Sequence, residues 1–206
     1  PIAVTELSLE TLKRHKLDEE KQNKIITDAI SETDRLNALC NNILLSSQLD
    51  AGGYKMDIHP FDLSELAKKI TDELKRRYPT RNFEHAIESG IVFNGEAFLL
   101  GLVLNNLLEN AVKYTKGDVM VSLQLKKTEQ HILLSVLDQG EGVPDPEKNK
   151  IFDKFYRMGD ESKRRAKGTG LGLYLSSKII RDHLGSLKVS DNKPHGAVFT
   201  IALPNE

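Results

Sequence analysis

The sequence predicts an α+β protein in which a helical hairpin precedes an α/β sandwich. Two observations support this fold class. In the first part of the chain, apolar or small residues recur at steps of three and four, which is the spacing of a helical seam. In the rest, helical stripes are mixed with short segments that predict mostly antiparallel strands. Gly52 and Gly53 lie between the two parts, so we place the domains at residues 1–53 and 54–206.

Composition and charge narrow the classes of function. A formal net charge of −1 and a pI of about 6.7 give no reason to expect nucleic acid or an anionic membrane as partner. The single cysteine, Cys40, excludes an intrachain disulfide and a multi-cysteine metal site. No apolar run is long enough to span a bilayer, so we expect a cytoplasmic chain without membrane contact of its own. The start at Pro1 suggests a fragment, whose full-length form could be membrane-anchored through upstream segments.

The hairpin consists of a helix from Pro1 to about His15 and a longer helix that ends at the two glycines. The seam of the longer helix is formed by Ile26, Ala29, Thr33, Leu36, Cys40, Ile43 and Ser47. An exposed stripe of this width would be an aggregation liability, so we predict that the hairpin dimerises into a four-helix bundle. The alternative is that the long helix packs on the domain that follows it.

The second domain should alternate helices with short strands. Its predicted elements are a strand at 54–58, a helix at 62–78, strands at 82–87 and 91–93, a helix capped by Asn94, strands at 119–125 and 131–137, a loop-rich stretch at 138–169, a helix at 171–184, and strands at 187–190 and 197–203. Pro60 should end the first strand, and Asp62 with Glu65 has the form of a capping box at the start of the first helix.

The helix after Asn94 carries an apolar stripe that becomes polar. Leu99 and Leu102 share a face with Asn106, Asn110 and Lys113, at successive steps of three or four residues. Two amides and an ammonium would be costly in a core without partners, so this face should look into a polar cavity. A cation with phosphate oxygens would suit such a cavity, because an amide oxygen can bind Mg²⁺ and a lysine can lie against phosphates.

Three further segments could carry chemistry. In Asp138-Gln139-Gly140-Glu141-Gly142 the glycines let the backbone approach a ligand, and Asp138 can accept a hydrogen bond from an amino group, although such a segment alone is also a common turn. The segment from Ile151 to Arg157 places two phenylalanines, Phe152 and Phe155, three residues apart and beside an arginine, but a helical turn that anchors its aromatics in the core explains it equally well.

The third segment is Gly168-Thr169-Gly170-Leu171-Gly172, which opens a helix. Its backbone N–H groups and the positive end of the helix dipole would face an anion. It matches neither the Walker loop nor the dinucleotide fingerprint. The preceding stretch is too polar to bury, and we interpret it as a mobile lid, although a charge run is more often a solvated loop. The lid residues that could approach phosphates are Lys163, Arg164, Arg165 and Lys167.

In this order and spacing, the four segments resemble the N, G1, F and G2 boxes of the sensor histidine kinase ATP-binding domain, within the wider family of gyrase, Hsp90 and MutL. The resemblance covers about residues 54–204, and the preceding hairpin resembles the dimerisation and phosphoacceptor domain of the same kinases. It implies a Bergerat-type sandwich, ATP and Mg²⁺ as cofactors, a homodimer through the hairpin, and the receiver domain of a response regulator as partner.

The resemblance also implies a role for each residue of the polar helix face. Asn110 would be the Mg²⁺ ligand, and Asn106 would be a supporting group near the ion. Lys113 would reach the phosphates and Tyr114 would stack on the adenine. ATPases of the wider family carry a glutamate where this chain has Asn106, and an amide cannot take a proton from water. Phosphoryl transfer is therefore favoured over hydrolysis, while Glu109 should only flank the site.

The remaining roles follow from the same resemblance. Asp138 would accept a hydrogen bond from the adenine amino group, with Gly140 and Gly142 making room for the base. Phe152 and Phe155 would anchor the lid. Arg157 would act on the phosphates together with Lys113, and the phosphates would be wrapped by Gly168, Thr169, Gly170, Leu171 and Gly172.

The acceptor histidine of this kinase family is not in the chain. Pro1 resembles the last residue of the family's acceptor motif, which would place the histidine five residues upstream. The six histidines present do not lie in that context. A nucleotide-sensing dimer without net phosphoryl transfer is the main alternative, and an ATPase or a serine kinase on the same scaffold is disfavoured by Asn106 and by the hairpin.

Overall fold

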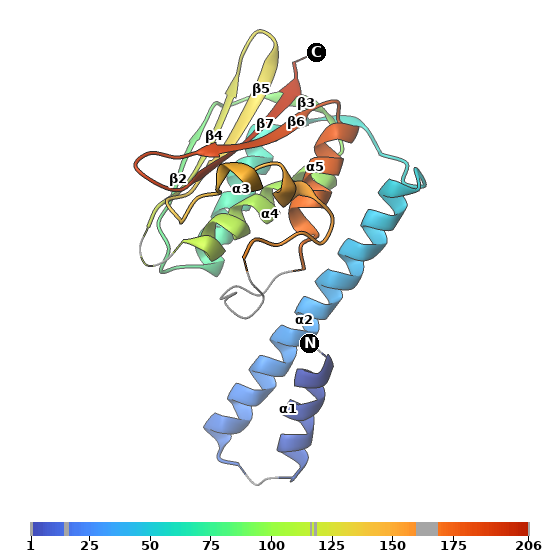
Figure 1. Cartoon of the computed structure of the whole chain (residues 1–206), viewed down its shortest axis with the longest axis vertical. Helices are drawn as coiled ribbons and strands as arrows, with labels where there is room; N and C mark the ends of the chain where they lie inside the picture. The colour runs from blue at the N-terminus through green and yellow to red at the C-terminus, as the bar shows by residue number, and fades with distance from the viewer. Residues whose placement is uncertain (1, 15–16, 116, 118, 160–168, 206) are drawn as a thin grey trace. The chain divides into compact units, whose positions relative to one another are not determined.

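The computed structural model describes residues 2–14, 17–115, 117, 119–159 and 169–205. The chain divides into two compact units, Pro1–Tyr54 and Lys55–Glu206 (Figure 1). In the described part of the chain, no helix is both long enough and apolar enough to cross a membrane.

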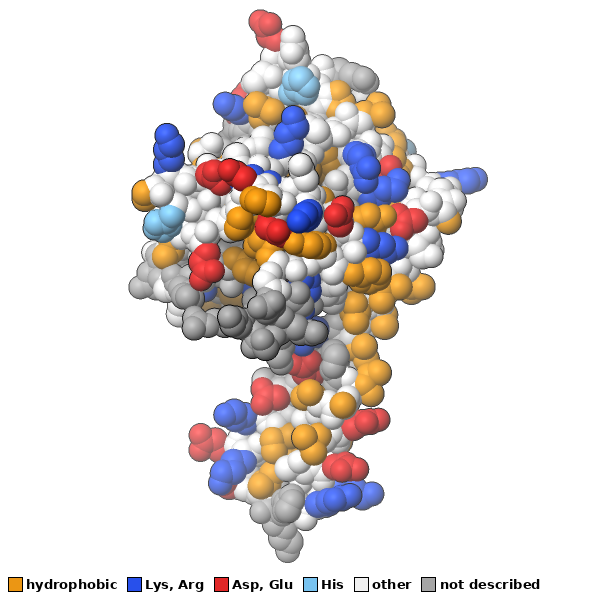
Figure 2. Space-filling view, viewed as in Figure 1, with side chains coloured by type: hydrophobic (Ala, Val, Ile, Leu, Met, Phe, Trp, Pro, Cys, Tyr) orange, Lys and Arg blue, Asp and Glu red, His pale blue; other side chains and the backbone are white. Residues whose placement is uncertain are grey.

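The first unit is a pair of helices, α1 (Ile2–Arg14) and α2 (Glu19–Asp50), which pack against each other. Helix α2 begins where the Asp18 carboxylate accepts a hydrogen bond from the Lys21 N–H, at 2.8 Å. Several large apolar side chains are exposed on both helices in the single chain, and Figure 2 shows hydrophobic side chains among charged ones on this unit. These exposed side chains are Ile2, Val4, Leu7, Leu9, Ile26, Ile30, Ile43 and Leu44.

The second unit is built on a five-stranded sheet in the order β2-β4-β5-β7-β6. Strands β2 and β4 are parallel, and the other neighbours are antiparallel. Its strands are β2 (Phe83–Ile87), β4 (Val121–Lys127), β5 (His131–Leu137), β6 (Ser186–Asp191) and β7 (Ala197–Pro204), and its helices are α3 (Leu63–Arg77), α4 (Ala97–Tyr114) and α5 (Gly172–Asp182). Two short 3-10 helices, η1 (Asp145–Glu147) and η2 (Lys150–Phe152), follow β5.

The three helices lie on one side of this sheet (Figure 1), and the core forms between the two layers. In β7 every second residue is buried, as expected for a strand with one face against helices. Helix α4 lies at the centre of the core and buries Leu99, Leu104 and Leu107 almost completely. The predicted fold class, an α+β protein with helices ahead of a sheet-based sandwich, is confirmed.

A second, two-stranded sheet pairs β1 (His59–Asp62) with β3 (Val92–Gly95), and it corrects two predictions. The strand predicted at 54–58 is wrong, because the first strand begins at His59 and does not end at Pro60. Pro60 lies inside β1, which a two-stranded ribbon tolerates because each strand has one unpaired edge. Asn94 does not cap α4, because the ribbon continues to Gly95 and holds Asn94 in an extended strand.

Half of the predicted capping box at the start of the first helix in this unit is observed, because Asp62 caps the helix while the Glu65 carboxylate pairs with Lys68. The Asp62 carboxylate accepts from the Glu65 N–H at 2.9 Å, and α3 begins at the next residue after Asp62. The N-cap of α4 is Glu96 instead of Asn94, and its side chain makes no capping hydrogen bond to α4. The start of α4 is therefore fixed by contacts from elsewhere in the fold.

Candidate functional site

Helix α4 presents the predicted polar face next to its buried one. Asn106 and Asn110 are half-buried, and Lys113 and Tyr114 are exposed near the end of the helix. The Lys113 ammonium lies 5.1 Å from the centroid of the Tyr114 ring, within the range of a cation–π contact. Glu109 forms an ion pair with Arg77 of α3, so its carboxylate is engaged away from the asparagines.

Asn106 joins α4 to the first turns of α5. Its Nδ2 donates a hydrogen bond to the buried hydroxyl of Ser176, at 2.8 Å. Its Oδ1 lies where a Cβ on Gly172 would stand, so only glycine fits at that position without displacing the amide. The Asn106 carboxamide therefore holds α4 against α5, the helix that follows the glycine loop.

Asp138 follows β5 and is only 4% exposed. Its Oδ1 accepts hydrogen bonds from the N–H groups of Gly140, at 2.8 Å, and Ala197, at 3.2 Å. Burial raises the pKa of this carboxyl, and the two N–H donors partly oppose that shift. No described residue donates a hydrogen bond to the other oxygen, Oδ2, which can therefore accept one from a ligand.

Three backbone segments converge on Asp138. A Cβ on Gly140 would lie 2.7 Å from the carbonyl oxygen of Tyr114, so the Asp138 loop contacts the end of α4 directly. A Cβ on Gly142 would lie 3.0 Å from the carbonyl oxygen of Gly196, which precedes β7. Gly140 and Gly142 thus allow the Asp138 loop to lie close to neighbouring backbone. This is a structural requirement for glycine in addition to the predicted room for a ligand.

The segment from η2 to Arg157 adjoins the glycine loop. Phe155 donates its N–H to the Gly170 carbonyl at 3.0 Å, and its side chain is 59% exposed. The alternative that both aromatics anchor the turn in the core is therefore wrong for Phe155; Ile151 is the buried residue here. Arg157 is half-buried and Phe152 likewise, so neither is fixed in the core.

The start of α5 has the properties of an anion site. Its N-cap, Leu171, is buried, and no side chain of the described residues caps the helix. The Thr169 hydroxyl accepts from the Leu171 N–H at 3.3 Å. A helix start without a side-chain cap is a common binding site for an anion, because its first N–H groups and the positive end of the helix dipole face outward. Gly168 and the four predicted lid bases lie outside the described residues.

Two contributors to this region were missed by sequence reasoning. Arg81 donates to the carbonyls of Val112, at 3.1 Å, and Thr115, at 2.9 Å, and also to that of Gly117, so its guanidinium caps the C-terminal end of α4. Asn192 donates to the Asp138 carbonyl at 2.8 Å. Neither has a local sequence signal, because each partner is more than 30 residues away.

The comparisons with known proteins agree with this geometry. Residues 95–206 match the family described as "Histidine kinase-, DNA gyrase B-, and HSP90-like ATPase". The chain belongs to this family. The match includes α4, the Asp138 loop and α5, so the segments that converge in the structure lie in an ATP-binding domain.

Relatives and solved structures narrow the family. The chain is 30% identical over 205 residues to the probable sensor histidine kinase TcrY of Mycobacterium tuberculosis, over 99% of this chain and 43% of TcrY. The structure of a mycobacterial sensor histidine kinase, MprB, aligns with a TM-score of 0.63 and 28% identity, over 71% of this chain and 97% of that one. The predicted resemblance to sensor histidine kinases is confirmed. The chain spans less than half of the length of curated relatives such as TcrY.

One further structure is similar in fold. The histidine kinase ThkA, solved in complex with the response regulator protein TrrA, aligns with a TM-score of 0.77 over 100% of this chain and 58% of that one. At 23% identity this likeness supports the fold alone.

Proposed function

We propose that the chain binds Mg²⁺-ATP and is the catalytic core of a sensor histidine kinase, which transfers the γ-phosphoryl group to a histidine for relay to a response regulator. The observation that carries the proposal is the buried carboxylate of Asp138. Two backbone N–H groups satisfy one oxygen and leave the other open. Such a carboxylate is suited to accept a hydrogen bond from the exocyclic amino group of adenine.

The polar face of α4 fits the rest of a nucleotide. No group of three or more His, Cys, Asp or Glu side chains in the described part could hold a metal ion. A Mg²⁺ ion would therefore rely on the Asn110 carboxamide, on phosphate oxygens and on water, as is usual for this ion. When bound, it would neutralise charge on the transferring phosphoryl group. Lys113, Arg157 and the first N–H groups of α5 would bind and orient the phosphates.

Asn106 favours transfer over hydrolysis. Its amide has no basic group to activate water, and its Nδ2 is already bonded to Ser176. The role proposed for it is therefore to hold α4 against α5 near the ion, while the attacking group comes from a protein acceptor. Residues 1–53 would supply the dimerisation hairpin, because the apolar side chains exposed on α1 and α2 form a surface that a second copy could cover.

The first test is nucleotide selectivity. The chain should bind ATP with Mg²⁺ and discriminate against GTP, because guanine presents a carbonyl where adenine presents its amino group. Asp138→Asn should weaken ATP binding roughly 10- to 100-fold, the usual effect of losing a hydrogen bond to a charged group. Isothermal titration calorimetry measures both effects.

The matched control is Asp72→Asn, which alters an exposed carboxylate on α3 and should leave the affinity for ATP unchanged. Equal affinity of the Asp138→Asn variant and the parent chain for ATP would contradict the assignment of the adenine site. An unaltered preference for ATP over GTP in that variant would contradict it as well.

The second test separates donor from acceptor. With γ-³²P-ATP the chain should bind nucleotide without acquiring acid-labile label, because the acceptor is expected upstream of Pro1. The full-length protein should be labelled at a histidine and should pass the label to a receiver domain. Labelling of any of the six histidines of this chain would contradict the placement of the acceptor. An unlabelled full-length protein that still binds ATP would favour the nucleotide-sensing alternative.

A further inference from the structure

The end of α5 meets the start of α4 through one buried imidazole. His183 is the C-cap residue of α5 and is 5% exposed. Its Nδ1 lies 2.8 Å from the Ile179 carbonyl oxygen, and its Nε2 accepts from the Glu96 N–H at 3.0 Å. A carbonyl only accepts, so Nδ1 carries the proton and Nε2 presents its lone pair to Glu96.

The bond to Glu96 replaces a local cap. In a capping box, the side chain at the third helical position reaches back to the N–H of the N-cap residue. In α4 that position is Leu99, which has no acceptor, and Glu96 makes no side-chain capping bond. His183 therefore supplies from another helix the acceptor that the sequence of α4 does not provide.

The surroundings of the ring keep it in place. The Phe93 ring centroid lies 6.2 Å from that of His183, and a Cβ on Gly95 would lie 2.9 Å from His183 Cδ2, so the ring touches the ribbon closely. The Glu96 side chain accepts from the N–H of Asp57 at 3.1 Å, in the segment that precedes β1. The N-cap of α4 is thus held by His183 through its backbone and by Asp57 through its side chain.

From this geometry we propose that His183 is a positioning residue for the nucleotide site, an inference that rests on the proposed function. It touches no substrate. It fixes the start of α4 on the end of α5, while Asn106 and Ser176 join the same two helices nearer the glycine loop. These two contacts set the register between the helix that carries Asn110 and the helix that opens the phosphate loop.

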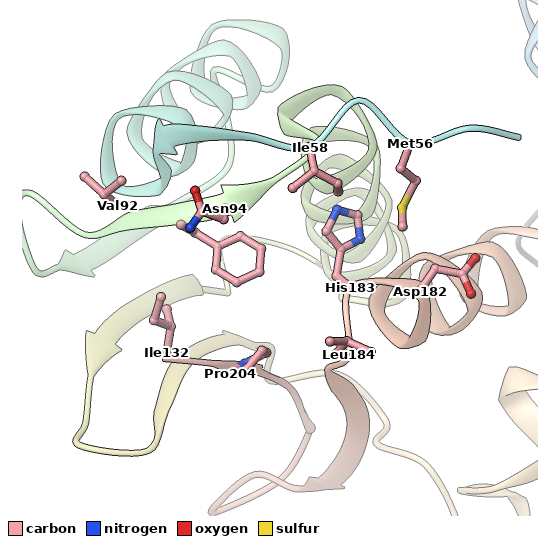
Figure 3. A pocket seen from close by; sticks show the side chains of 10 residues that line it. Met56, Ile58, Val92, Asn94, Ile132, Asp182, His183, Leu184 and Pro204 are labelled. Atoms are coloured by element: carbon pink, nitrogen blue, oxygen red, sulfur yellow. The ribbon is translucent and has the colours of Figure 1, made fainter. Parts of the chain in front are cut away.

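A cavity beside the His183 ring allows the contact between His183 and the Glu96 N–H to be tested with a small molecule. Its volume is about 240 Å³, and Figure 3 shows the His183 imidazole extending from the end of α5 toward Met56 and Ile58, which line it. None of the predicted nucleotide-site residues lines this cavity. A small heterocycle placed there would approach the imidazole position without entering the nucleotide site.

The test compares substitutions at His183 in this chain. His183→Leu keeps apolar volume and removes the acceptor, whereas His183→Gln keeps an acceptor near the Nε2 position. ATP affinity is measured by calorimetry, and amide hydrogen exchange is followed at Glu96 and at Leu175, which is bonded to Leu171 in the first turn of α5. The leucine variant should bind ATP about three- to tenfold more weakly, with faster exchange at both amides, and the glutamine variant should resemble the parent chain.

Two controls separate positioning from general stability. His85→Leu alters an exposed histidine of β2 and should change nothing. Leu125→Ala removes core volume from β4 and should lower the melting temperature while leaving the ATP affinity of the folded chain intact. The positioning role is overturned if Leu125→Ala and His183→Leu lower the melting temperature equally and also weaken ATP binding equally.

Chemical rescue gives an independent result. His183→Gly opens the ring position to the adjoining cavity, so added imidazole should restore slow exchange at Glu96 and the parental affinity for ATP, and should have no effect on His85→Gly. Absence of rescue, together with parental affinity in a folded His183→Leu variant, overturns the proposal. If the parent chain itself binds no ATP, the proposed function fails, while exchange at Leu175 still decides whether His183 positions α5.

Discussion

Gly196→Ala is expected to lower the free energy of unfolding of the catalytic unit by roughly 3 kcal/mol and to abolish tight ATP binding. Gly196 has a φ of +113°, a conformation that residues with a side chain rarely adopt. A Cβ there would overlap the Asp138 carbonyl oxygen and would lie 2.7 Å from Gln139 Cα, so backbone has to move. The displaced backbone is the one that presents the Ala197 N–H to the Asp138 carboxylate.

The free energy of unfolding can be measured by circular dichroism during urea unfolding. Tryptophan fluorescence cannot follow the transition, because the chain contains no tryptophan. The transition of the helical unit has to be resolved from that of the catalytic unit, since a chain of two units need not unfold in one step. Gly90→Ala is the matched control. Gly90 has a φ of +74°, and in the described part of the chain no atom lies within 4 Å of the added Cβ, so the substitution should cost only about 1 kcal/mol. Equal costs for the two substitutions would show that the contact with Asp138 is not what requires glycine.

Much of this fold could be predicted because its signals are local. The step of three and four residues along α2, the stripe of α4 and the N-cap at Asp62 are properties of neighbouring residues. The two errors at β1 and β3 have a single cause. The pairing of Pro60 with Asn94 is a contact between distant segments, and it overrides both the strand-ending tendency of proline and the capping tendency of asparagine.

The residues of the candidate site also fall into those with a local sequence signal and those that depend on contacts between distant segments. Asn106, Asn110 and Lys113 could be found because a helix repeat places them on one face. Arg81 and His183 could not, because they act on carbonyl or N–H groups of a helix far away in the sequence, and backbone groups have no sequence signature. The individual roles of the site residues toward ATP and Mg²⁺ stay predictions for the experiments above.

Gly170→Ala is expected to weaken nucleotide binding through the glycine loop, because it moves this loop without touching Asp138. Gly170 has a φ of +72°, and a Cβ there would lie 2.6 Å from the carbonyl carbon of Phe155. The loop would have to move away from that segment and would lose the hydrogen bond from the Phe155 N–H. Since the first turn of α5 follows directly, ATP affinity should fall by about tenfold or more.

Gly159→Ala is the control for conformational strain alone. Gly159 has a φ of +75°, and no atom of the described residues lies within 4 Å of the added Cβ, so this variant should bind ATP like the parent chain in the same titration. A second variant locates the conflict. The atoms that Gly170→Ala would meet belong to the backbone of Phe155, so adding Phe155→Ala removes the aromatic ring without removing them or freeing that backbone, which has a φ of +65°. The double variant should therefore bind ATP as weakly as Gly170→Ala alone, and recovery of affinity would place the conflict in the side chain instead.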